Sequence, residues 1–151
     1  MPDSMKHHPL QPLLLTLAQF GLAAAIFLQH AWSRDNYVAN FLVVAGAAVM
    51  IWAIFSMGSK TLTVSPTPRE SASLKTTGAY RWVRHPMYSA LLLASAGCAF
   101  APPQISITIC WIGLLGTLLL KIRFEETLLS ERFPEYVEYQ RKTSMLIPFV
   151  V

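Results

Sequence analysis

The sequence predicts an all-α integral membrane protein with about four transmembrane helices, folded as one domain over residues 1–151. Hydrophobic residues make up 54% of the chain and charged residues only 13%, roughly half the usual charged share. The apolar residues gather in runs, and a helix needs about 20 of them to cross a bilayer. This composition excludes a disordered chain, a disulfide-stapled secreted domain and an ordinary water-soluble enzyme. No basic stripe is interleaved with aromatic residues, so we expect no nucleic-acid partner.

Residues 1–57 contain the first two predicted spans. The first runs from Leu10 to Trp32, and its length exceeds the core of a signal peptide, so we expect it to be retained. The second runs from Val38 to Met57 and carries a patch of small residues, 45–48, suited to close contact with a neighbouring helix. The same patch would permit a homo-oligomer. The short link between the spans makes them antiparallel neighbours.

Residues 58–85 form the only long polar segment between spans, and we expect a cytoplasmic loop there. A helical hairpin follows over residues 86–122. Its first arm, Met87 to Ala101, is short, so whether it crosses fully stays open. Pro102-Pro103 breaks the hairpin, and the second arm runs from Ile105 to Leu120.

Residues 123–151 form a charged segment that continues the last span out of the membrane. We expect the helix to break at Pro134, a short second helix to follow, and the apolar tail 145–149 to dock back at the interface. Cys98 and Cys110 flank the hairpin turn; we interpret them as small buried apolar residues and leave their pairing open.

The positions of the basic residues predict the topology. With four spans, only Arg34 of the 12 Lys and Arg residues lies on the opposite side from both termini. Basic residues mark the cytoplasmic side, so we expect both termini in the cytoplasm, and a bacterial inner membrane as the location.

A polar cluster stands where the hairpin begins, over residues 78–88. Pro86 suits the first turn of a helix and disfavours helical geometry at His85. His85 would therefore sit at a helix N-terminus, where free backbone N–H groups attract anions. Arg84 reinforces that charge, so a carboxylate or phosphate of a ligand could bind here. The alternative is that these basic residues only anchor the helix at lipid headgroups.

A second cluster is the acidic pair Glu125-Glu126. Adjacent helical residues point about 100° apart, so the two cannot act as one carboxylate dyad. One could face a pocket while the other pairs with a basic residue such as Arg81 or Arg84; which faces inward stays open. The alternative is a solvated helix face just outside the membrane.

Together these segments resemble the isoprenylcysteine carboxyl methyltransferase family, which shares its signature with the phospholipid methyltransferases. The resemblance covers residues 76–149 and depends on the spaced pattern as a whole. Ala90 departs from it, since relatives often have glycine there, and this could narrow the space for a cofactor. The matching strings are Gly78-x-Tyr80, Arg84-His85-Pro86-x-Tyr88, Glu125-Glu126, Phe133-Pro134-Glu135-Tyr136-x-x-Tyr139 and Leu146-Ile147-Pro148.

The resemblance implies an enzyme that uses S-adenosylmethionine from the cytosol and a lipophilic small-molecule or lipid substrate from the bilayer. It implies no metal. Arg123 would orient the acceptor if that is a carboxylate, and would be structural if it is an amine or thiol. Direct methyl transfer needs alignment and exclusion of water more than a strong base, which a short chain can supply. The implied cofactor-binding residues are Arg84, His85, Tyr88, Glu125 and Glu126.

Other functions fit less well. Membrane sterol reductases, which use a nicotinamide cofactor, resemble the same Arg-His-Pro-x-Tyr region but are much longer. An exporter would need an acid in mid-membrane, and the spans contain none. A haem protein would need histidines deep in the helices. A degenerate, non-catalytic relative of the same fold stays an alternative.

Overall fold

A computed structural model of the chain describes residues 10–29, 35–57, 74–100 and 104–150. Within these residues it has five α-helices, a short 3-10 turn and no strand, so the predicted all-α fold is confirmed. The predicted end of the first span at Trp32, the break at Pro102-Pro103 and loop residues 58–73 lie outside the described residues. The elements are α1 (Leu10–Gln29), α2 (Tyr37–Met57), η1 (Gly78–Arg81), α3 (Pro86–Phe100), α4 (Ile105–Arg132) and α5 (Tyr136–Lys142).

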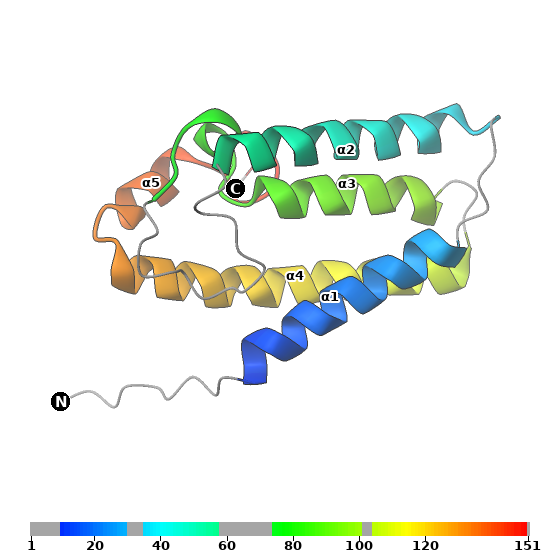
Figure 1. Cartoon of the computed structure of the whole chain (residues 1–151), viewed down its shortest axis with the longest axis horizontal. Coiled ribbons are helices and arrows are strands. Elements are labelled where there is room, and N and C mark those ends of the chain that lie inside the picture. The colour runs from blue at the N-terminus through cyan, green and yellow to red at the C-terminus, as the bar shows by residue number, and fades with distance from the viewer. Residues whose placement is uncertain (1–9, 30–34, 58–73, 101–103, 151) are drawn as a thin grey trace.

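Three helices, α1, α2 and α4, are long and apolar enough to cross a membrane. The remaining apolar helix, α3, has 15 residues, about 22 Å of helix. It lies alongside α2, while α1 crosses α4 obliquely (Figure 1). The large exposed side chains of α2 are apolar, which suits a surface turned towards lipid; they are Tyr37, Val38, Phe41, Val44, Ile51, Trp52, Ile54 and Phe55.

Small residues let α2 and α3 approach closely. A Cβ atom added at Gly46 would stand 2.7 Å from the Ala90 carbonyl oxygen and 2.7 Å from Ala94 Cβ. One added at Gly97 would stand 2.7 Å from the Ala39 carbonyl oxygen. The predicted small-residue face thus meets a helix of the same chain. Ala90 lies at this helix contact, where it serves packing between α2 and α3.

We expect Gly46→Val to destabilise the protein by about 1–3 kcal/mol or more, because the added side chain meets backbone that cannot move aside. Thermal unfolding in detergent measures this. Gly21→Ala is the matched control, since a Cβ at Gly21 meets nothing within 4 Å. It should be neutral or stabilising by about 0.5–1 kcal/mol, the usual gain from removing glycine from a helix. Equal effects of the two substitutions would contradict the packing.

The apolar core lies between α1, α3 and α4. Cys98 belongs to it, and within the described residues Cys98 and Cys110 form no disulfide with each other. The interpretation of Cys98 as a small buried apolar residue is confirmed. The fully or almost fully buried members of this core are Ile26, Leu92, Cys98, Ala99, Ile107, Leu114 and Leu118.

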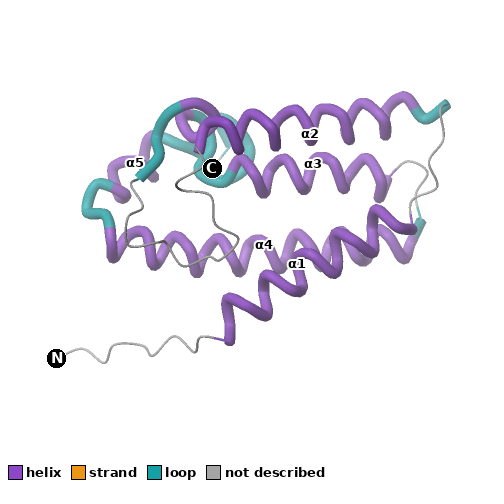
Figure 2. Tube along the Cα trace, in the orientation of Figure 1, coloured by secondary structure: helices purple, strands orange, loops and turns teal. Residues whose placement is uncertain are grey.

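The chain folds back on itself at the polar end of the bundle. α4 ends at Arg132 and α5 begins at Tyr136, so the helix breaks around Pro134 as predicted. Past α5, the final segment runs beside the turn that precedes α3 (Figure 2). The Arg84 N–H donates to the Ser144 carbonyl at 2.8 Å, and the Ser144 N–H donates to the Trp82 carbonyl at 3.3 Å. The tail is thereby held against the start of α3, where Leu146 packs on the core.

Candidate functional site

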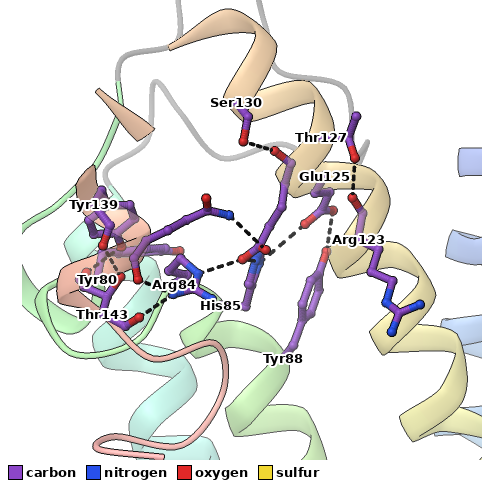
Figure 3. Close-up of polar contacts among 12 residues, drawn as sticks. Tyr80, Arg84, His85, Tyr88, Arg123, Glu125, Thr127, Ser130, Tyr139 and Thr143 are labelled. Carbon is purple, nitrogen blue, oxygen red and sulfur yellow. Dashed lines mark hydrogen bonds and ion pairs between the residues drawn. The ribbon is translucent and has the colours of Figure 1, made fainter. Parts of the chain in front are cut away.

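The residues of the two polar clusters meet where α3 begins and α4 leaves its apolar stretch (Figure 3). Pro86 is the first residue of α3, as predicted, and His85 precedes it. The His85 carbonyl accepts the first backbone bonds of the helix, from the N–H groups of Tyr88 and Ser89 at 3.1 Å each. The His85 side chain is therefore held at a helix N-terminus.

Arg84 joins three parts of the chain. Its Nε donates to Glu126 Oε1 at 2.7 Å, and its Nη1 donates to the Gln140 carbonyl at 3.0 Å and to the Thr143 carbonyl. Its side chain is only 10% exposed. The guanidinium thus fastens α5 and the final segment to α4, and its donors are directed to protein acceptors. The predicted pairing of one acid with Arg84 is confirmed for Glu126.

His85 lies between the two acids. Its Nε2 is 3.3 Å from Glu126 Oε1, and its Nδ1 is 3.6 Å from Glu125 Oε2. The two carboxylates diverge from the helix, as their spacing predicts, yet a single imidazole reaches both. The ring also stacks on Tyr88, with 5.6 Å between centroids and 8° between planes.

Glu125 accepts a hydrogen bond from the Tyr88 hydroxyl at 2.6 Å. Tyr88, His85, Glu125 and Glu126 therefore form one connected polar cluster, and Arg84 holds it from outside. Four of the five predicted cofactor-binding residues thus lie in mutual contact range, and Arg84 contacts Glu126 behind them.

Arg123 does not join this cluster. It is exposed, and its guanidinium points away from His85, Tyr88 and Glu125 (Figure 3). It lines a wide, open groove of ≈ 650 Å³. Glu126 lines the same groove, so the groove adjoins the polar cluster. The other lining residues are Thr127, Ser130, Glu131 and Gln140.

Sequence reasoning missed Lys121 and Gln19, and both are buried. Lys121 Nζ donates to Gln19 Oε1 at 2.8 Å and lies 5.4 Å from the centre of the Tyr88 ring. In the sequence, Lys121 directly follows the last predicted span, which ends at Leu120. Two signals were available: an amide in the middle of an apolar helix, and a lysine one helical turn before Glu125.

Tyrosines support the cluster from the side of α5. The Tyr139 hydroxyl donates to the Tyr80 carbonyl at 2.6 Å, which ties α5 to η1. Burial raises the pKa of Tyr139 to about 12, and burial also raises the pKa of Tyr136 above its ordinary value. Both hydroxyls therefore stay protonated at neutral pH. In the part of the chain that the structure describes, no group of three His, Cys, Asp or Glu side chains could hold a metal ion.

Comparisons with known proteins agree with the resemblance seen in the motifs. The family model for phospholipid methyltransferases matches residues 35–136, so the match reaches α2 and begins well before residue 76. Protein-S-isoprenylcysteine O-methyltransferase A of Arabidopsis thaliana is 29% identical over 96% of this chain and 75% of its own length.

Two other relatives are proteins of other kinds, and the chain spans a smaller share of each of them. A nickel-cobalt-cadmium resistance protein of Alcaligenes xylosoxydans is 30% identical over 82% of this chain, which spans only 58% of that relative. Methanethiol S-methyltransferase of Mycobacterium tuberculosis is 36% identical over 46% of this chain and 28% of its own length. With more than half of its residues matched by the family model, the chain belongs to the phospholipid methyltransferase family.

Proposed function

We propose that this protein transfers a methyl group from S-adenosylmethionine to a lipophilic or membrane-partitioned acceptor. The observation that carries the proposal is the cluster of His85, Tyr88, Glu125 and Glu126 beside an open groove at the polar end of an apolar bundle. This position lets a water-soluble cofactor and a lipid-soluble acceptor reach the same site. The family match supports methyl transfer over a nicotinamide-dependent reduction.

The residues present fit S-adenosylmethionine, which supplies an electrophilic methyl group on a sulfonium. Glu126 lines the groove, where its carboxylate would accept hydrogen bonds from the ammonium or the ribose hydroxyls. His85 and the N-terminus of α3 would hold the carboxylate. The Tyr88 ring already contacts His85 and the Lys121 ammonium, so Tyr88 would act on the cofactor as part of the polar cluster. Glu125, bonded to the Tyr88 hydroxyl, would keep that ring in place.

Arg84 would act on the cofactor through Glu126, because its donors are directed to that carboxylate and to two carbonyl groups. Arg123 lies on the groove with its guanidinium exposed. There it would orient a carboxylate acceptor, and it would be dispensable for an amine or a thiol. The relatives' names include an oxygen and a sulfur acceptor, so both classes belong in a substrate screen.

The membrane arrangement proposed here places the groove and both termini on the cytoplasmic side, in a bacterial inner membrane. The lipid bilayer then surrounds the apolar helices and also supplies the lipophilic acceptor. Three apolar helices of sufficient length support a membrane location, and the basic residues at the polar end support its orientation. A homo-oligomer would have to use a surface other than Gly46, which is occupied by α3.

The cofactor proposal is tested by titrating the full chain in detergent with S-adenosylhomocysteine in a calorimeter. We expect saturable binding at one site per chain, since the product shares the cofactor's amino acid and ribose groups. NADPH is the matched comparison. A folded sample that binds NADPH and leaves S-adenosylhomocysteine unbound would favour a reductase, and a sample that binds neither would identify a non-catalytic relative. Radiolabelled methyl transfer to lipid extracts, prenylcysteine analogues, amines and thiols then identifies the acceptor.

A further inference from the structure

The most unusual feature outside the polar cluster is a buried lysine paired with a buried amide. Lys121 is 2% exposed and Gln19 is 7% exposed. The 2.8 Å bond between Lys121 Nζ and Gln19 Oε1 joins α4 to α1. Among the described residues Lys121 forms no ion pair within 4.0 Å.

An ammonium and an amide are expensive to bury in an apolar bundle. Each must keep its hydrogen bonds or lose several kcal/mol of solvation, and polar groups within membrane helices are functional by default. Leucine at position 19 would avoid the cost of burying the amide, and leucine at position 121 would avoid the cost of burying the ammonium. Anchoring α1 on α4 does not require them, because Ile26 of α1 already packs with Leu114 and Leu118 of α4.

The Gln19–Lys121 pair lies next to the proposed site. Lys121 Nζ lies 5.4 Å from the centre of the Tyr88 ring, and the Tyr88 hydroxyl donates to Glu125 at 2.6 Å. A cation over an aromatic face is an attractive contact that strengthens away from water. Gln19, Lys121, Tyr88 and Glu125 therefore form a continuous path from α1 to the polar cluster.

The family match begins at residue 35, so α1 lies outside it. We propose that Gln19 is a positioning residue: it directs the Lys121 ammonium over the Tyr88 ring and so keeps the Tyr88 hydroxyl on Glu125. α1 thereby becomes part of the site in addition to being a membrane helix. This inference rests on the proposed methyl transfer, since positioning is the main requirement of a direct displacement.

The first test is a double-mutant cycle with Gln19→Leu, Lys121→Met and the double variant. Activity is radiolabelled methyl transfer from S-adenosylmethionine to the best acceptor among a prenylcysteine analogue, methanethiol and phosphatidylethanolamine vesicles. We expect Gln19→Leu to lower kcat about tenfold, with KM for S-adenosylmethionine within about twofold. Because Gln19 acts through Lys121, adding Gln19→Leu to Lys121→Met should lower kcat no further.

Two variants separate positioning from folding. Gln19→Glu keeps an acceptor oxygen at the same place and should restore most of the activity that Gln19→Leu loses. Thr16→Val is the matched control on α1, because the Thr16 hydroxyl donates within its own helix, to the Pro12 carbonyl. It should leave kcat within about twofold, as expected for a half-buried site without shared partners.

The second test needs no acceptor. Amine acetylation of the folded chain in detergent is quantified at Lys121 relative to Lys142, which is exposed. We expect Gln19→Leu to raise the Lys121 rate about fivefold, because a freed ammonium samples more open rotamers. Thr16→Val should leave the ratio unchanged.

Additive losses in the cycle, full activity of Gln19→Leu, or an unchanged Lys121 acetylation ratio would each overturn the role of Gln19. Failure of the proposed methyl transfer would give a different result from failure of the role of Gln19. The unaltered chain would then bind no S-adenosylhomocysteine, while the acetylation ratio would still report whether Gln19 holds Lys121.

Discussion

Replacing Arg84 by leucine is expected to destabilise the protein by about 3–5 kcal/mol, the usual loss when one partner of a buried ion pair is removed. The substitution leaves the Glu126 carboxylate without its 2.7 Å partner and frees the carbonyls of Gln140 and Thr143. α5 and the final segment should then detach from the start of α3. Thermal unfolding in detergent, with proteolysis of the C-terminal segment, measures both effects.

Arg123→Leu is the matched control for Arg84→Leu, since both remove one guanidinium and Arg123 is exposed. It should change stability by less than about 0.5 kcal/mol. Arg84→Lys should fall between them, because lysine keeps the charge but lacks the planar set of donors that reaches three acceptors. Equal stability of Arg84→Leu and Arg123→Leu would show that Arg84 does not hold the C-terminal segment.

The second large effect is expected from Glu126→Gln, which should weaken S-adenosylhomocysteine binding about 10- to 100-fold. The carboxylate of Glu126 lines the groove and is oriented by Arg84 and His85. Hydrogen bonds to a charged group contribute about 1.5–3 kcal/mol, and glutamine keeps the size of the side chain while removing the charge. Calorimetric titration of folded protein measures the change.

Glu138→Gln is the control for Glu126→Gln. Glu138 is exposed on α5, where it pairs with Lys142, and it lies outside the groove-lining residues. Its removal should leave the affinity within about twofold, since an exposed pair contributes little. Unchanged affinity in folded Glu126→Gln protein would remove Glu126 from the proposed cofactor site.

Much of the fold could be predicted because the apolar runs, and the prolines that begin or break the helices, are local features. Pro86 begins α3 at the predicted residue, since proline suits the first helical turn. The break at Pro134 follows from the missing N–H and the ring of proline. The sequence predicts that one of the two acids pairs with a basic residue such as Arg81 or Arg84, because unpaired acids beside a membrane are costly. The pair that forms is Glu126 with Arg84.

The identity of the buried cation could not be predicted in the same way. Lys121 and Arg123 are two positions apart and so project about 200° apart around α4. One of them must face inward and the other outward, and the local sequence does not distinguish them. The structure turns Lys121 inward because its partner Gln19 comes from 102 positions away in the chain. The partners of Arg84 in residues 140 and 143 depend likewise on distant segments.

α4 is one uninterrupted helix from Ile105 to Arg132, and it carries both an apolar stretch long enough to cross a membrane and Glu126. A helix whose apolar length differs from the thickness of the surrounding hydrocarbon responds by tilting. Since no break separates the lipid-facing turns from the turn that bears Glu126, such a tilt reaches the groove without loss. The acyl-chain length of the host membrane thereby becomes a physical input to the geometry of the groove.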